Sequence, residues 1–181
     1  MGPVVASTTD RAVTTTADPR TGREGELVHE LRIVGVRVEL PTNQPIVLLK
    51  EVDGDRFLPI WIGAVEATAI AYEQQGITPA RPLTHDLMRD VIMALGVRLA
   101  SVEITRIEET VYYADLVFDG DIRVSARPSD AIALALRTGT TVWCSDDVLR
   151  DSGITMSEAA DDEVERFREF LDNVTPEDFA E

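Results

Sequence analysis

Alternating apolar and polar residues mark the first regular segment of the chain. Between residues 31 and 40 every second side chain is apolar, a pattern typical of a strand with one buried face. The predicted buried face holds Val34, Val36, Val38 and Leu40. Shorter apolar runs predict strands at residues 46–51, 57–62, 97–108, 110–118, 122–126 and 140–144. Asp53-Gly54-Asp55 and Asp119-Gly120 predict the turns of two hairpins.

The apolar periodicity changes to that of a helix in three places. Residues 63–75 are mostly small and apolar, and residues 85–95 carry one apolar arc behind Thr84 as the expected N-cap. The segment 131–136 is apolar on nearly every side, which predicts a central buried helix whose polar line is Asp130 and Arg137. Residues 146–150 predict one more helical turn. Hairpins mixed with helices indicate an α+β fold, a single domain with a mixed or antiparallel sheet and packed helices.

Both ends of the chain differ from this central part. Residues 1–26 show no periodicity and predict a disordered tail, so the folded domain is expected at residues 27–155. Residues 156–181 predict an acidic amphipathic helix, because Val164, Phe167 and Leu171 recur at helical spacing. No apolar run is long enough to span a membrane, no secretory signal is visible, and Cys144 is the single cysteine. These features favour a cytoplasmic protein.

The charge is strongly negative and unevenly placed. The formal net charge is −16, and residues 156–181 alone hold 2 basic and 10 acidic side chains. The basic residues are arginines except for Lys50. An acidic protein does not attract nucleic acid through its overall field. Binding to nucleic acid therefore requires a local arginine cluster or bridging metal ions.

Two short strings place an arginine and a proline directly before a helix. They are Arg81-Pro82-Leu83-Thr84-His85-Asp86-Leu87 and Ala126-Arg127-Pro128-Ser129-Asp130-Ala131. Proline favours an extended backbone at the arginine before it and tolerates the first helical turn. Each string thus fixes an arginine beside hydroxyl and carboxylate groups at the positive end of a helix. Such a group can hold a phosphate or a metal, or it can simply cap the helix.

The two strings, together with Leu58-Pro59-Ile60-Trp61-Ile62-Gly63 and Glu66-Ala67, resemble the bifunctional nuclease domain family. The strings stand in the family's order, and the similarity covers roughly residues 27–155. The resemblance implies an α+β domain that self-associates, as a homodimer or a higher homo-oligomer. It also implies nuclease activity on DNA and RNA, hence a nucleic-acid partner.

The residues themselves suggest where such chemistry lies. Carboxylates often cleave phosphodiesters by holding Mg²⁺ or Mn²⁺. The predicted catalytic residues are His85, Asp86 and Asp130, and the predicted metal ligands are Asp86, Asp90 and Asp130. Arg81, Arg127 and Ser129 are the predicted substrate-binding residues.

Structural roles for the same residues remain open alternatives. Asp86 and Asp90 lie four residues apart and can form a solvated face in which Asp86 pairs with Arg89. His85 can pack beside Ile92, Asp130 can form a buried pair with Arg127 or another arginine, and Glu66 can form a structural pair with an unknown partner. Asp115 is expected to face solvent at a sheet edge. Trp61, Tyr72, Tyr112 and Tyr113 can stack bases or simply pack in the core or an interface. The alternative function is a non-enzymatic, self-associating structural or regulatory domain.

Overall fold

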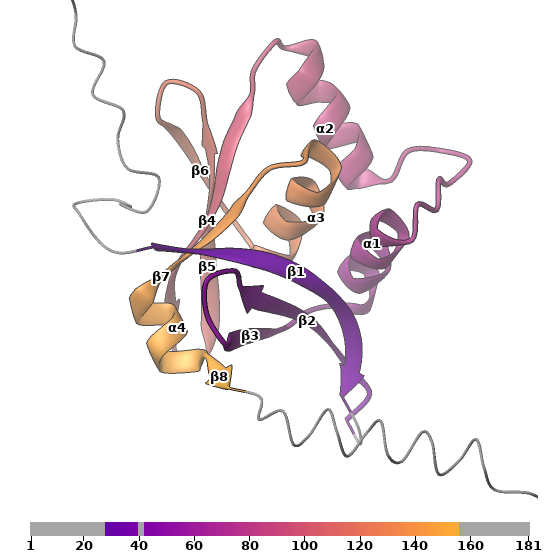
Figure 1. The fold of residues 1–181 in the computed structure, drawn as a ribbon. Helices are drawn as coiled ribbons and strands as arrows, with labels where there is room; N and C mark the ends of the chain where they lie inside the picture. The colour runs from indigo at the N-terminus through magenta and orange to yellow at the C-terminus, as the bar shows by residue number, and fades with distance from the viewer. Residues whose placement is uncertain (1–27, 40–41, 156–181) are drawn as a thin grey trace, which may run out of the picture.

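One mixed sheet and four helices make up the part of the chain that the structure describes. The structure is a computed structural model and describes residues 28–39 and 42–155 (Figure 1). The strands are β1 (Val28–Glu39), β2 (Gln44–Glu51), β3 (Arg56–Trp61), β4 (Leu99–Glu108), β5 (Val111–Phe118), β6 (Ile122–Ala126), β7 (Val142–Ser145) and β8 (Ile154–Thr155). The helices are α1 (Ala64–Gln74), α2 (Thr84–Ala94), α3 (Pro128–Thr138) and α4 (Asp146–Ser152). The predicted disordered tail and acidic C-terminal helix lie outside the described residues.

Two antiparallel meanders are joined into this sheet by one late strand. The strand order is β6-β5-β4-β7-β1-β2-β3-β8. β7 pairs antiparallel with β1 and parallel with β4, so it connects the β1-β2-β3 meander to the β4-β5-β6 meander. Both predicted hairpin turns are present, and Gly120 and Asp121 both have positive φ, as a tight hairpin turn requires. The predicted α+β class with a mixed sheet is confirmed.

The predicted buried face of the first strand is wrong in detail. The register between β1 and β2 shifts by one residue between Ile33 and Gly35. An extra residue in a strand turns the following side chains to the other face. Leu31, Ile33 and Val36 therefore pack on the core, whereas Val34 is exposed. Val38 is on the same face as Val36, but it lies near the end of β1 and is exposed. Leu40 lies outside the described residues.

The three longer helices form a layer with α3 at its centre. α3 lies on β4 and β5, α1 lies on β1 and β2, and α2 packs mainly against α3 (Figure 1). Most of α3 is buried, including Ile132 and Leu134, as its uniformly apolar sequence predicts. The residue before α2 is Leu83, so Thr84 is the first helical residue and not the N-cap. The Asp86 carboxylate accepts a hydrogen bond from the backbone N–H of Leu83 at 2.8 Å and caps the helix instead.

One polar position in the sheet also departs from expectation. Asp115 is not at an edge, because β5 lies between β4 and β6. Its side chain is mostly buried, directly across from Glu103 and 4.0 Å from Arg123.

Among the described residues, no helix is long and apolar enough to cross a membrane.

Candidate functional site

The start of α3 places an arginine at the edge of a cavity. Arg127 is the residue before the helix and has extended backbone angles, which Pro128 enforces. Its carbonyl oxygen accepts the first helical hydrogen bonds, from the N–H groups of Asp130 and Ala131. The Arg127 side chain remains 65% exposed. Ser129 follows in the first turn and is buried.

The Arg127 guanidinium joins carboxylates from two helices. Its Nη2 atom lies 2.8 Å from Glu66 Oε1 on α1 and 3.0 Å from Asp130 Oδ1 on α3. Its Nε atom lies 2.7 Å from Asp130 Oδ2. Hydrogen bonds from its own backbone N–H and from Arg127 lower the pKa of Glu66. Two carboxylates therefore converge, ionised, on a single positive group.

The same aspartate supports the histidine of α2. His85 Nε2 lies 3.0 Å from Asp130 Oδ1, and the imidazole is largely buried. Burial alone would raise the pKa of Asp130, but hydrogen bonds from Arg127 and His85 outweigh it and lower that pKa. An ionised carboxylate only accepts hydrogen bonds, so Nε2–H is the donor. In the neutral ring, Nδ1 is then the basic nitrogen. We call Glu66, His85, Arg127 and Asp130 the α3 cluster.

A cavity of about 440 Å³ opens beside this cluster. Its lining includes Arg127, Pro128 and Ser129 from the start of α3 and Trp61 and Tyr112 from β3 and β5. Arg127 is the residue that belongs to both the cavity and the α3 cluster. A ligand in the cavity thus meets a guanidinium whose other partners are two carboxylates.

Asp86 belongs to a different arrangement, the buried ion pair of Arg137. Arg137 Nε lies 2.6 Å from Asp86 Oδ1, and the Arg137 side chain is 1% exposed. Its Nη1 and Nη2 atoms donate to the carbonyl oxygens of Ala133 and Ala69 at 2.9 and 3.1 Å. Burial would raise the pKa of Asp86, but hydrogen bonds from Arg137 and from the Leu83 N–H lower it. This pair fastens α2 and α1 to α3.

The remaining predicted site residues lie apart from the cluster. Asp90 is exposed and accepts hydrogen bonds from Arg89 at 2.7 and 2.9 Å, so Arg89 pairs with Asp90 and not with Asp86. Arg81 is exposed and makes no hydrogen bond or ion pair with any residue that the structure describes. Asp86, Asp90 and Asp130 each face different partners. Within residues 28–39 and 42–155, no group of three or more His, Cys, Asp or Glu side chains could hold a metal ion.

Glu66 and the aromatic lining of the cavity were missing from the predicted site. Glu66 is conspicuous in sequence as an acidic residue in the first turn of a helix of small apolar residues. Its distant arginine partner is Arg127, 61 residues away, which sequence spacing cannot reveal. Of the four aromatic candidates, Trp61 and Tyr112 line the cavity, whereas Tyr113 packs against Arg106 with 3.9 Å between the guanidinium carbon and the ring centroid.

Comparison with known proteins gives a consistent family signal. A family model described as the bifunctional nuclease domain matches residues 47–157. Two uncharacterized proteins of Mycobacterium tuberculosis, MT1877 of strain CDC 1551 and Rv1829 of strain H37Rv, are each 54% identical to this chain over 159 residues. Each alignment covers 83% of this chain and 97% of the relative.

Proposed function

Because the chain belongs to the bifunctional nuclease domain family, we propose that it hydrolyses phosphodiester bonds of DNA or RNA at the α3 cluster. The observation that carries this proposal is the position of Arg127. It is exposed to the cavity, while its guanidinium is bound to two carboxylates, one of which also holds His85. Phosphate binding, a place for a cation and a proton-transfer group thus meet within one connected set of side chains.

Arg127 is the group that we assign to the scissile phosphate. A guanidinium binds phosphate through paired N–H donors, and a helix N-terminus adds backbone N–H groups and a positive dipole. Arg127, the residue before α3, supplies the guanidinium, and Ser129 supplies the backbone N–H of the first turn that does not donate to the Arg127 carbonyl oxygen; both residues line the cavity. Arg81, the other predicted phosphate ligand, is not part of this cavity and has no role in the proposal.

A divalent cation, Mg²⁺ or Mn²⁺, fits the two carboxylates of the cluster. Glu66 Oε1 and Asp130 Oδ1 already lie within hydrogen-bond distance of the same Arg127 nitrogen. Mg²⁺ is commonly held by one or two carboxylates, with water and substrate phosphate as its other ligands. When bound, it would polarise the phosphate and acidify a ligated water. We therefore assign the ion to Glu66 and Asp130, in place of the predicted set Asp86, Asp90 and Asp130.

His85 is the group that we assign to proton transfer. Asp130 accepts the hydrogen bond of Nε2–H, with 3.0 Å between Nε2 and Oδ1, and this fixes the ring and leaves Nδ1 to accept or donate a proton. Asp130 thus orients His85 in addition to its place beside the cation. The exposed Arg127 side chain can leave the two carboxylates for the phosphate when a cation takes over their charge.

Hydrolysis of labelled single-stranded and duplex DNA and RNA tests the proposal. We expect cleavage with Mg²⁺ or Mn²⁺ and none with EDTA. Arg127→Ala and His85→Gln should each lower the rate at least tenfold, about 1.4 kcal/mol of barrier. Arg150→Ala is the matched control: Arg150 is 63% exposed and also bound to two aspartates, but on α4. Cleavage that survives EDTA, or that is unchanged in both site variants, would refute the proposal.

One observation favours the alternative function, a self-associating domain. α2 and the residue after it expose apolar side chains four residues apart, namely Leu87, Val91 and Leu95, with Met88 beside them. A stripe of this kind on a soluble domain indicates a binding surface. We infer that two copies of this chain pack their α2 helices together in a two-fold dimer.

Light scattering tests the dimer independently of catalysis. The chain has a mass of 19.9 kDa, and we expect a particle of twice that mass for the wild type. Leu87→Glu and Leu95→Glu should both give the monomer. Val65→Glu should not, although Val65 is 79% exposed on α1, because it lies off the stripe. A wild-type monomer throughout the micromolar range would exclude this interface.

A cytoplasmic location is part of the same proposal, since a single cysteine suits a reducing compartment.

A further inference from the structure

The lining of the cavity beside the α3 cluster has a second, aromatic part, which the binding of phosphate does not use. Trp61, the last residue of β3, is 51% exposed and lines this part. Its Nε1–H donates to Glu39 Oε2 on β1 at 3.0 Å. The hydrogen bond fixes one edge of the indole, so the half-exposed ring is held in place. A large aromatic surface that is exposed yet held is favourable for stacking.

Tyr112 provides a second fixed ring in the same lining. It is the second residue of β5, and its hydroxyl donates to the carbonyl oxygen of Pro59 on β3 at 3.4 Å. The lining beside these rings also includes the apolar residues Ile60, Ile62 and Val111. The volume of about 440 Å³ is within the range, roughly 300–1,000 Å³, of cavities that hold small organic ligands.

The two parts of the lining have chemistry that suits the phosphate and the base of a nucleotide. Arg127 and Ser129 offer a guanidinium and a helix N-terminus, which suit a phosphate. Trp61 and Tyr112 offer aromatic surface, which suits a base, and the polar side chain of Gln44 lies in the same lining. Phosphate alone would leave the aromatic part empty, and an apolar ligand alone would leave Arg127 unused.

We propose that this cavity binds one unstacked nucleotide, with its base against Trp61 and Tyr112 and its phosphate on Arg127. The inference rests on the proposed function for the identity of the reaction, but the binding event itself does not require hydrolysis. A base inside a duplex is already stacked and paired, and it must leave the helix to enter such a cavity. The subsite therefore selects single-stranded nucleic acid, and it does so through a base and not only through the backbone.

Binding of short oligonucleotides tests this subsite directly. The probes are a single-stranded ten-nucleotide DNA, the same strand in a duplex, and a single strand of equal length with abasic residues. All three carry phosphates, but the abasic strand has no bases. Fluorescence anisotropy is measured in Ca²⁺, and a gel afterwards shows whether the strands are intact. We expect the base-containing single strand to bind at least tenfold more tightly than the other two.

The two tryptophans of the chain allow a matched pair of variants. Trp61→Leu should abolish the preference for bases, whereas Trp143→Leu should retain it, because Trp143 lies outside this cavity. In the Trp143→Phe protein, quenching of the remaining indole reports contact of a base with Trp61. Equal affinity for the abasic strand, or a preference that survives Trp61→Leu, would overturn the subsite. A retained base preference without any hydrolysis would instead reject the proposed reaction and leave the subsite standing.

Discussion

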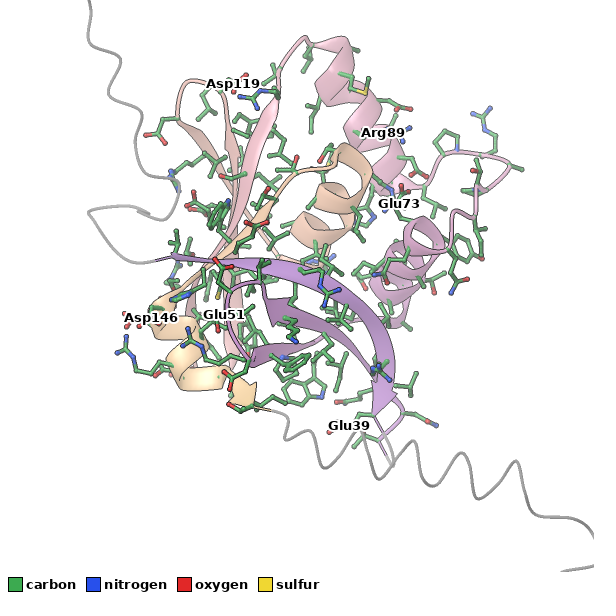
Figure 2. The ribbon with its side chains drawn as sticks, in the orientation of Figure 1. Glu39, Glu51, Glu73, Arg89, Asp119 and Asp146 are labelled. Atoms are coloured by element: carbon green, nitrogen blue, oxygen red, sulfur yellow. The ribbon has the colours of Figure 1, made fainter. Side chains whose placement is uncertain are left out.

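Arg127 and Arg137 stand at the two ends of α3 and make opposite uses of the same side chain. Arg127 is 65% exposed and holds two carboxylates, Glu66 and Asp130, at the rim of a cavity. Arg137 is 1% exposed and holds Asp86 together with two backbone carbonyl oxygens. Figure 2 labels Glu73 on α1 and Arg89 on α2, which line one cavity together with Arg137.

The two arginines differ in whether water can solvate the guanidinium when its carboxylate partners are lost. Water can solvate Arg127 if its carboxylates leave, so its ion pairs contribute about 0–1 kcal/mol to the free energy of folding. The Arg137 side chain is almost wholly buried, and losing Asp86 would leave this buried charge with Glu73, 3.9 Å from its Nε atom, as its nearest carboxylate. The buried arginine therefore stabilises the fold, whereas the exposed arginine can exchange its carboxylate partners for a ligand.

The largest expected effect concerns the buried pair. Arg137→Ala and Asp86→Ala should each lower the free energy of unfolding by about 3–5 kcal/mol, because each removes one partner of a buried ion pair. Arg127→Ala should lower it by no more than about 1 kcal/mol. Urea midpoints of the three variants give the comparison. Equal midpoints for Arg127→Ala and Arg137→Ala would mean that burial does not distinguish the two ends of α3.

The sequence suggests a buried pair at the start of α3, whereas the structure places the buried pair at its end. Asp130 and Arg137 were correctly placed on one line of a nearly apolar helix, and an unpaired Asp130 in such a helix suggests a buried pair with Arg127. The structure instead leaves Arg127 exposed and buries Arg137. Periodicity shows which residues share one face of a helix, but the burial of each residue depends on the neighbouring helices. Here the neighbouring helix is α2. Its His85 lies 45 residues before Asp130 in the sequence, and its Asp86 lies 51 residues before Arg137.

More of the fold than of the candidate site could be predicted from the sequence. Local signals, such as Asp119-Gly120 and the apolar run 131–136, correctly predict elements of hairpin and helix. The bulge at Ile33–Gly35 and the parallel pairing of β7 with β4 carry no local signal, because both depend on contacts between distant strands. The same is true of Glu66, whose pairing with Arg127 requires the packing of α1 beside α3.

The second prediction separates catalysis from stability by comparing Asp130, the partner of Arg127, with Asp86, the partner of Arg137. Asp130→Asn should lower the rate of hydrolysis at least tenfold, about 1.4 kcal/mol of barrier, because it weakens both the cation site and the support of His85. Asp86→Asn should instead lower the urea midpoint and leave the rate per folded molecule near that of the wild type. Rates and midpoints are measured on the same preparations. A large rate loss in Asp86→Asn at full folding would return Asp86 to the catalytic site.

The third prediction concerns acid. The pKa of Asp86 is lowered in the fold by Arg137 and the Leu83 N–H, so its ionised form contributes stability above the unfolded pKa of about 3.9. That contribution is lost as pH falls through the lower pKa of the folded protein. Urea midpoints should therefore decrease from pH 6 to pH 3 more steeply in the wild type than in Asp86→Asn. Parallel curves would show that the pair does not titrate with folding.

The smallest expected effect is that of Asp90→Ala. Asp90 and its partner Arg89 are neighbours on the exposed side of α2, where an ion pair is solvated and screened. We expect a change of no more than about 0.5 kcal/mol in the free energy of unfolding. We also expect no change in the metal dependence of hydrolysis, because the proposed cation lies between Glu66 and Asp130. The measurement is the rate as a function of Mg²⁺ concentration for Asp90→Ala beside Glu66→Gln. If Asp90→Ala shifts that curve and Glu66→Gln does not, the cation binds on the face of α2, and Arg127 does not share its carboxylates with it.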